Sequence, residues 1–115
     1  MSQTLLKTNK IRNSKEYRRV LDTGAKIATR QLVTVVEKTE AADARLGLIV
    51  SRKIGNAVVR NRIKRQIREA FRKNKDDYAG MDIVVIARQY ARGASSTQLG
   101  DTLQYSLNRV RSSAK

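Results

Sequence analysis

The stretch IGNAVVRNRIKRQIREAFRK, residues 54–73, combines a helical rhythm of apolar side chains with a dense run of arginines and lysines. Asn56 is a suitable N-cap, so the pattern predicts a helix from about Ala57 to Lys73. Five apolar side chains fall within roughly a third of the helical wheel, the width of a core-facing stripe. They are Val59, Ile63, Ile67, Ala70 and Phe71. The sequence therefore predicts one buried face on this helix.

The opposite face of the helix is predicted to be a cationic ribbon. Its members and flanks are Asn61, Arg62, Lys64, Arg65, Arg68, Arg72 and Lys73. A solvated helix would offset these charges with acids, but Glu69 is the only one, so the repulsion favours an anionic partner. Arginine suits bidentate phosphate contacts and stacking on bases, so we expect nucleic acid. A membrane-surface helix is the weaker alternative because Phe71 is its only aromatic residue.

The composition of the whole chain supports this interpretation. The 115 residues suffice for one domain, and 25 lysines and arginines against 10 acids give a formal net charge of +15, which favours polyanions. No apolar run is long enough for a membrane span or a signal peptide, so we expect a cytoplasmic protein. Cysteine and histidine are absent, which excludes disulfides and thiolate zinc sites and removes the commonest general base.

The remaining segments predict a layered α/β domain. Before the basic helix, the sequence predicts a mobile basic arm over 1–12, a helix capped by Asn13 and ended by Gly24, and one or two strands over 26–37. A loop over 38–44 and a strand over 45–52 then lead into the basic helix. After it come a polar turn over 76–80, a strand over 81–88 and a last helix that begins after Ser95. The apolar run over 81–88 predicts a central strand. The order predicts a β-α-β unit through the basic helix, and the general rule makes that crossover right-handed.

The sequence does not contain an evident catalytic site. Most acids lie near predicted loops or element ends, and the adjacent pair Asp76 and Asp77 reads more readily as a solvated turn than as a cation site. Gly55 stands alone, so there is no glycine-rich phosphate loop. These observations favour a binding protein over an autonomous enzyme.

Residues 51–72, SRKIGNAVVRNRIKRQIREAFR, closely resemble the signature of the bacterial ribonuclease P protein subunit, centred on Arg60, Asn61 and Arg62. Weaker similarity extends through NSKEYRRVLDTG, ATRQLVTVV, RLGLIVSRK and DIVVIARQYA. The resemblance implies an α+β fold, a single-domain α-β sandwich with one mixed sheet of about four strands and three helices. It also implies a left-handed β-α-β crossover through the basic helix, against the general rule.

The resemblance further implies a role inside a ribonucleoprotein enzyme. In this family an RNA is the catalyst, and the protein promotes endonucleolytic removal of the 5′ leader from precursor tRNA. Mg²⁺ does the chemistry and is held mainly by the RNA. The implied partners are ribonuclease P RNA and precursor tRNA, with one protein per RNA, no membrane and no small-molecule cofactor. No side chain of the protein is implied to be catalytic, and whether any of them binds a metal stays open.

Two binding surfaces follow from the resemblance. The catalytic RNA is expected to contact Arg52, Lys53, Arg60, Asn61, Arg62, Lys64, Arg65 and Arg68. The single-stranded leader is expected in a cleft between the first helix and the sheet, which requires stacking and cations. The matching positions there are Tyr17, Leu21, Arg30 and Val35. Leu21 and Val35 stand where many relatives carry aromatic residues, which weakens the stacking, and simple packing of Tyr17 is the alternative.

Two other functions stay open at this point. A ribosomal or other structural RNA-binding protein would explain the charge and the size, but not the order of residues in the signature. An autonomous metal-dependent nuclease would need paired carboxylates facing a cleft, which the acids do not supply. A copurifying catalytic RNA would distinguish a ribonuclease P subunit from a structural RNA-binding protein. An autonomous nuclease would have to cleave its substrate with the RNA removed.

Overall fold

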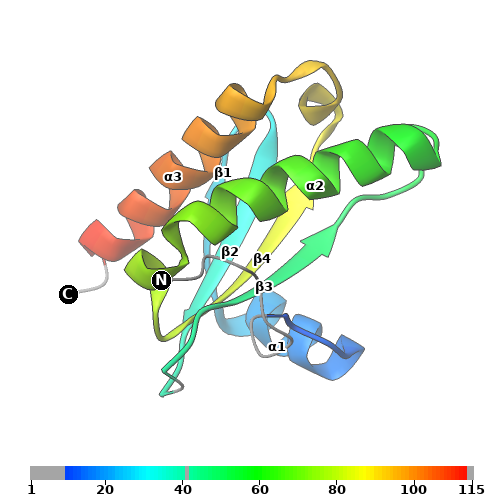
Figure 1. The fold of residues 1–115 in the computed structure, drawn as a ribbon. Coiled ribbons are helices and arrows are strands. Elements are labelled where there is room, and N and C mark those ends of the chain that lie inside the picture. Colours follow the sequence, from blue (N-terminus) through cyan, green and yellow to red (C-terminus); the bar gives the residue numbers. More distant parts are fainter. Residues whose placement is uncertain (1–9, 41, 114–115) are drawn as a thin grey trace.

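The computed structural model describes residues 10–40 and 42–113, which form one mixed sheet with helices on both faces (Figure 1). Within these residues the helices are α1 (Ser14–Thr23), α2 (Ala57–Asn74) and α3 (Ser96–Ser113), with two short 3-10 helices, η2 (Lys75–Tyr78) and η3 (Gln89–Gly93). The strands are β1 (Ala25–Ala28), β2 (Leu32–Lys38), β3 (Arg45–Ile49) and β4 (Met81–Ala87). The predicted α+β class with three helices and four strands is confirmed. No helix in this part of the chain is both long and apolar enough to cross a membrane.

The sheet has the strand order β1-β2-β4-β3. β2 pairs antiparallel with both β1 and β4, whereas β3 lies at the edge and pairs parallel to β4. The β-branched run over 26–37 forms two strands, and the amide of Thr29 donates to the carbonyl oxygen of Leu32 at 2.8 Å in the turn between them. β4 is central and almost entirely buried, as its continuous apolar run predicts.

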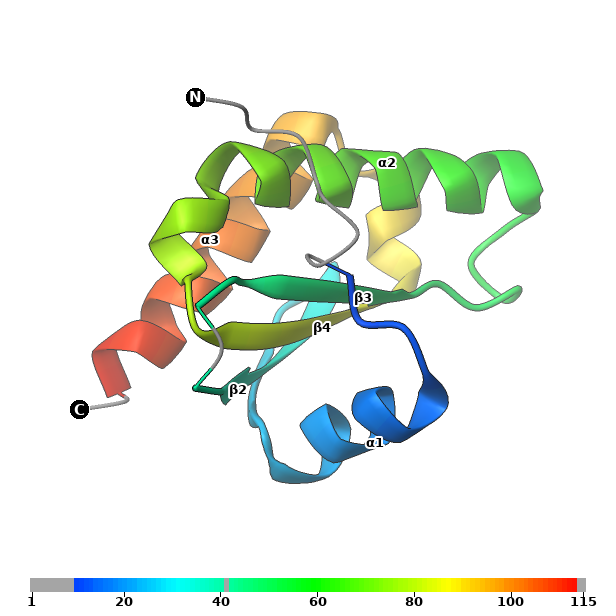
Figure 2. The same ribbon diagram turned by 60° about the horizontal axis from the view of Figure 1, so that its bottom comes forward.

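The connection from β3 through α2 to β4 has a left-handed sense. In Figure 1, α2 lies in front of the sheet, and β4 lies to the left of β3 when both strands are turned to point upwards. The expectation from the general rule is therefore wrong here, and the one from the family resemblance is confirmed. Helices α2 and α3 cover one face of the sheet, and α1 covers the other (Figure 2). This arrangement places α2 beside the outer edge of β3.

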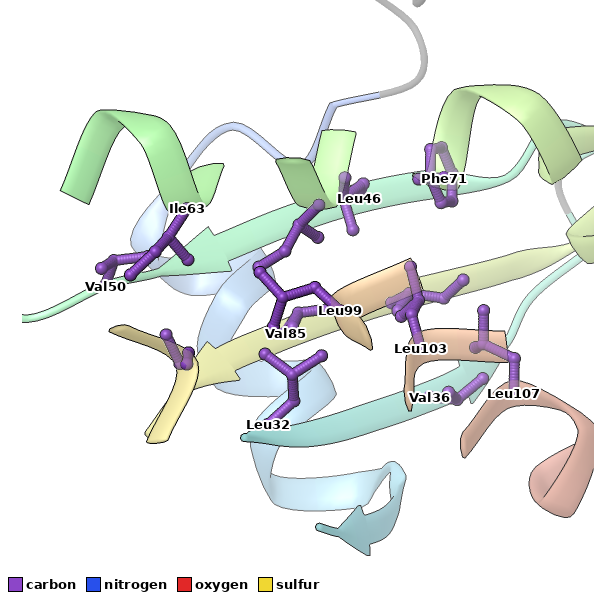
Figure 3. Close-up of a cluster of buried hydrophobic side chains, with 14 of the residues drawn as sticks. Leu32, Val36, Leu46, Val50, Ile63, Phe71, Val85, Leu99, Leu103 and Leu107 are labelled. Atoms are coloured by element: carbon purple, nitrogen blue, oxygen red, sulfur yellow. The ribbon is translucent and has the colours of Figure 1, made fainter. Parts of the chain in front are cut away.

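The larger core lies between the sheet and the pair α2 and α3 (Figure 3). The buried residues that α2 contributes are Ile63, Ile67 and Phe71, with Val59 and Ala70 packed at the margin. Those from α3 are Leu99, Leu103, Leu107 and Val110. The predicted apolar stripe of α2 is therefore confirmed, and α3 carries a comparable one. Each fully buried side chain of this kind contributes about 1.5–3 kcal/mol, so the two helices are firmly attached to the sheet.

A second, smaller core lies between α1 and the opposite face of the sheet. Its buried members are Ile11, Val20, Val35 and Val84. Partly buried residues pack against them, among them Tyr17, Leu21 and Ile49. Helix α1 thus rests on few fully buried apolar contacts, and polar interactions have more weight in holding it than they have for α2 and α3.

The predicted helix caps are confirmed. The side-chain oxygen of Asn13 accepts the amide of the residue three positions later at 2.9 Å, and that of Asn56 accepts the amide of Val59 at 3.0 Å. Ser95 and Gln98 form a reciprocal capping box, with amide-to-side-chain distances of 2.8 and 3.1 Å. These bonds satisfy amides that lack partners inside the helix and fix where each helix begins.

The structure corrects the extent of the predicted N-terminal arm. Residues 1–9 lie outside the described residues, but the chain is already held against the sheet at residue 10. Ile11 is only 5% exposed, and its amide donates to the carbonyl oxygen of Leu46 at 3.0 Å. Lys10 forms an isolated parallel bridge with the same residue. An apolar side chain in an otherwise basic segment is what attaches residues 10–12 to the edge of β3.

The predicted polar turn over 76–80 is also partly buried. Tyr78 is 1% exposed, and its ring stacks on Phe71 with 6.5 Å between the centroids. Its hydroxyl donates to Oε1 of Gln104 at 2.5 Å, which links η2 to α3. Gly80 then turns the chain into β4 with a φ of 78°, a conformation that favours glycine.

Candidate nucleic-acid interface

The outer side of α2 carries cations that make no hydrogen bond or ion pair within the described residues. Arg65 and Arg68 are exposed, and neither makes a hydrogen bond or an ion pair there. Lys64 is half-buried and equally unpaired, and Asn61 is exposed one turn earlier. Arg72 differs, because it donates to the carboxylate of Glu69 at 2.6 Å. The guanidinium groups of Arg65 and Arg68 in the middle of α2 are therefore the best placed to donate hydrogen bonds to phosphates.

The two arginines of the predicted triplet are partly engaged with the protein itself. Nε of Arg60 donates to the carbonyl oxygen of Gly55 at 3.2 Å. Nη2 of Arg62 donates to the carbonyl oxygen of Arg92 at 2.6 Å, while its Nε is buried without a partner. Arg62 thus connects α2 to η3. Sequence reasoning placed all three members of the triplet toward RNA, whereas the structure leaves only Asn61 fully exposed and unengaged.

The turn before α2 presents the other two predicted cations. Arg52 and Lys53 are both exposed in the segment that leads from β3 into the helix. The backbone of this turn is held in place, because the carbonyl oxygen of Lys53 accepts Nε2 of Gln89 at 3.2 Å. Their positive charges therefore extend the ribbon of α2 around the end of the sheet.

A small pocket brings the two predicted surfaces together. It has a volume of about 240 Å³ and lies beside the outer edge of β3. Its lining residues are Lys10, Ile11, Tyr17, Leu46, Leu48, Lys64 and Arg68. Tyr17 was assigned to the leader, whereas Lys64 and Arg68 were assigned to the catalytic RNA. The pocket combines an aromatic ring, an apolar floor and three cations, which is the combination that single-stranded nucleic acid requires.

The ring of Tyr17 is fixed in this pocket by the strand beneath it. Its hydroxyl oxygen accepts the amide of Leu48 at 3.1 Å, which satisfies a donor on the open edge of β3. A Cβ at Gly47 would lie 2.6 to 2.9 Å from three atoms of the Tyr17 ring. Glycine is therefore what allows the ring to lie close to the strand. Tyr17 thus packs against β3 but is only half-buried, so part of its side chain still faces solvent.

The other predicted leader residues lie in different surroundings. Val35 is fully buried in the core under α1, so its side chain offers no surface to RNA. Leu21 is half-buried and packs against the same core. Arg30 is exposed in the turn between β1 and β2, where its guanidinium lies 4.6 Å from the centroid of the Tyr90 ring. The structure thus brings Tyr17 together with α2, and places Arg30 at a separate aromatic residue.

An ion network that the sequence did not indicate holds α1 to the sheet. Asp82 of β4 is 1% exposed and lies between two guanidinium groups. Arg45 of β3 donates to it through Nε and Nη2 at 2.9 and 2.8 Å, a bidentate contact. Arg19 of α1 donates to the same carboxylate at 2.5 Å. Glu16 and Glu37 complete the network, through Arg45 at 2.9 Å and Arg19 at 2.6 Å.

The network shifts the pKa values of three of its members, Glu16, Arg19 and Arg45. The hydrogen bond from Arg45, followed by that from the amide of Arg12, holds the pKa of Glu16 below its ordinary value. The hydrogen bond to Asp82 raises the pKa of Arg45, and the one to Glu37 raises that of Arg19. All of these shifts favour the charged forms. The ion pairs of this network therefore hold α1, which carries Tyr17, against strands β3 and β4.

The acids of the protein do not fit a catalytic metal site. Within residues 10–40 and 42–113, no group of three or more histidine, cysteine, aspartate or glutamate side chains is placed to hold a metal ion. Glu16, Glu37 and Asp82 line one open concavity, but each of them is bonded to an arginine. A divalent cation would have to displace those guanidinium groups. These three carboxylates are therefore already engaged by arginines of the protein.

Comparison with known proteins gives a consistent result. The sequence profile of the family described as ribonuclease P matches residues 5–111. The ribonuclease P protein component of Macrococcus caseolyticus is 39% identical over 100 residues, which cover 86% of this chain and 87% of that protein. The protein of the same name from Staphylococcus haemolyticus is 39% identical over 101 residues, or 88% of this chain and 89% of that one.

Solved structures of similar proteins have the same fold. A mutant of the Staphylococcus aureus RNase P protein with defective mRNA degradation activity superposes with a TM-score of 0.84 at 38% identity, covering 91% of this chain and 90% of that one. The RNase P protein of Thermotoga maritima, in complex with 1-(4-fluorophenyl)-2-thiourea, gives a TM-score of 0.77 at 30% identity, covering 83% and 94%. The similarity therefore extends over nearly the whole of each structure.

Proposed function

This chain belongs to the ribonuclease P protein component family, and from that premise we propose that it binds the catalytic RNA and the 5′ leader of precursor tRNA. In this role it promotes endonucleolytic removal of the leader, which yields the mature 5′ end of the tRNA. The observation that carries the proposal is the pocket in which Tyr17 of α1 meets Lys64 and Arg68 of α2. In this proposal catalysis lies with the RNA, as the resemblance to the family implies.

The catalytic RNA is proposed to lie along α2 and the turn before it. Arg65 and Arg68 supply unpaired guanidinium groups for phosphates, and Arg52 and Lys53 extend the positive surface. The other contacts proposed for this surface are Arg60, Asn61, Arg62 and Lys64. The bond from Arg62 to η3 gives this residue a positioning role in addition to any contact with RNA.

The leader is proposed to pass over the edge of β3 at Tyr17. The ring provides a stacking surface, and Lys64 and Arg68 are close enough to neutralise the backbone of the same strand. Arg30 is a further cation for this path. Leu21 and Val35 act beneath it, through the packing that places α1 on the sheet.

Further features of the proposal follow from the chemistry of the family. Mg²⁺ is held mainly by the RNA, which agrees with a protein whose grouped carboxylates are bonded to arginines. The partners are ribonuclease P RNA and precursor tRNA, with one protein per RNA and no small-molecule cofactor. The compartment is the cytoplasm. A purely structural RNA-binding role would leave the tyrosine in the pocket without a ligand.

Replacing Tyr17 by alanine is expected to weaken binding of precursor tRNA to the holoenzyme by about tenfold. The loss of one base–aromatic stack costs about 1–3 kcal/mol of binding free energy. Binding of mature tRNA should not change, because mature tRNA has no leader. Equilibrium binding of precursor and mature tRNA to the assembled ribonucleoprotein measures the difference. The affinity of the protein for the catalytic RNA is expected to stay within about twofold.

The control for this experiment is an exposed tyrosine elsewhere. Tyr105 lies on α3 and is 53% exposed, so its replacement by alanine should leave both tRNA affinities unchanged. Tyr17→Phe should retain most of the affinity for the precursor, since the ring remains. If Tyr17→Ala lowers the affinities for precursor and mature tRNA equally, Tyr17 only packs α1 against β3 and the proposed leader site is wrong.

A further inference from the structure

An exposed aromatic residue lies at the end of the sheet, away from the Tyr17 pocket. Tyr90 of η3 is 63% exposed, more than either of the half-buried residues Tyr17 and Leu21. The guanidinium of Arg30 lies over its ring at 4.6 Å from the centroid, within the range of a cation–π contact. The two residues come from segments far apart in the sequence, the β1–β2 turn and η3. One side of the ring is thus covered by a cation, and its remaining surface faces solvent.

The segment that carries Tyr90 is held on both sides. At its start, the amide of Arg88 donates to the carbonyl oxygen of Gln31 at 2.8 Å, and its Nη1 donates to that of Thr29 at 2.9 Å. Gln89 is bonded to the turn before α2 at 3.2 Å. On the other side, Arg62 of α2 holds the carbonyl oxygen of Arg92 at 2.6 Å. The exposed ring therefore stands on a fixed support, which lowers the entropy lost when a ligand binds.

The surroundings of Tyr90 indicate what kind of ligand it suits. Single exposed aromatic residues are common and need no explanation by themselves. Here, however, the exposed side chains of Arg30, Arg88, Arg92 and Lys53 belong to the segments that hold η3. An aromatic face among cations is the arrangement that binds an unpaired base together with its phosphates. Duplex RNA would use the cations but not the ring.

We propose that Tyr90, supported by Arg30, stacks on an unpaired base of the 5′ leader that lies farther from the mature 5′ end than the nucleotide bound at Tyr17. This inference rests on the proposed function. β3 leads from the Tyr17 pocket into the turn at Lys53, whose carbonyl oxygen is bonded to Gln89 of η3, so an RNA strand that follows these segments would pass from one ring to the other. The leader is favoured over the catalytic RNA because it is single-stranded, and only unpaired bases offer a face to an aromatic ring.

The test uses the holoenzyme and precursor tRNAs whose leaders are lengthened one nucleotide at a time. With the unaltered protein, affinity should rise at two leader lengths, one for each ring. In Tyr90→Ala the second rise should disappear, a loss of about 5- to 20-fold for the long leader, whereas the first rise and the affinity for mature tRNA should be retained. Tyr90→Phe should behave like the unaltered protein, and Arg30→Gln should lose part of the second rise.

Tyr105→Ala is the matched control, because Tyr105 is also exposed and also has an arginine near its ring, Arg109 at 5.9 Å. It should leave both rises intact. If Tyr90→Ala keeps the second rise while Tyr17→Ala loses the first, the inference is wrong and the proposed function stands. If neither variant alters the dependence of affinity on leader length, both this inference and the proposed leader site at Tyr17 are wrong. If Tyr90→Ala instead weakens binding of the catalytic RNA with no tRNA present, the ligand is that RNA and the leader assignment is overturned.

Discussion

Replacing Asp82 by alanine is expected to lower the free energy of unfolding by about 2–4 kcal/mol, because it leaves Arg45 and Arg19 without their shared carboxylate. Asp82 is 1% exposed, whereas the two arginine side chains are 22% and 45% exposed. Water therefore compensates part of the loss, and the cost stays below that of breaking a fully buried pair. Urea denaturation followed by circular dichroism measures the change without adding salt.

Two further variants separate the causes of this loss. Asp82→Asn keeps the volume and removes the charge, so it should retain part of the stability. Glu69→Ala breaks the ion pair with Arg72 on α2, in which the glutamate is 53% exposed, and should cost much less stability than Asp82→Ala. If Asp82→Ala costs no more than Glu69→Ala, the network does not fasten α1 to the sheet.

The double variant Arg65→Gln with Arg68→Gln is expected to weaken binding of the catalytic RNA by roughly 30- to 150-fold at moderate salt, about 1–1.5 kcal/mol for each charged contact. Both guanidinium groups are exposed and unpaired in the described part of the chain, so their removal should not disturb the fold. The slope of log K against log salt concentration should fall by about 1.4–1.8, since two phosphates are no longer neutralised. Filter binding over a series of salt concentrations measures both values.

A charge-matched control distinguishes specific contacts from general attraction. Lys15 of α1 and Lys26 of β1 are exposed, and α1 lies on the opposite side of the sheet from α2 (Figure 2). Replacing both by glutamine removes the same net charge and should change the slope by much less. An equal loss in the two double variants would mean that net charge, and not the α2 ribbon, determines the affinity. Arg62→Ala is a less informative choice, because it also releases Arg92.

The sequence predicted the fold well where local patterns are strong. The stripe from Val59 to Phe71, the capping residues Asn56 and Ser95, and the apolar run of β4 all lie where periodicity and capping chemistry placed them. Strand order and the hand of the crossover depend on contacts between distant segments. The general rule predicted the wrong hand, and only the resemblance to a known family predicted the left-handed one.

The candidate site was less predictable because side-chain partners are set by the fold. Asp82 was read as an acid near the end of a strand. In the sheet it faces Glu37 on one side and Arg45 on the other, and it is buried under Arg19. A correct strand pairing would have brought these residues into one row. Periodicity within a single segment could not do so, since they come from four elements.

The aromatic positions show the same limit. Val35 occupies a leader position in the resemblance, yet it is fully buried under α1. No pattern in the neighbouring sequence marks Tyr90 as a binding residue. Its partner Arg30 lies 60 positions earlier, and the contact between them exists only after β1, β2 and β4 have paired.

The measurement that tests the central claim most directly is cleavage of a 5′-labelled precursor tRNA at low Mg²⁺. Three reactions are compared, with the cognate catalytic RNA alone, the protein alone, and both together. We expect that only the mixture cuts efficiently at the mature 5′ end, and that the Arg65 and Arg68 double variant needs a higher protein concentration to do so. If the mixture cuts no faster than the RNA alone, or if the protein alone cuts the substrate, the proposed function is wrong.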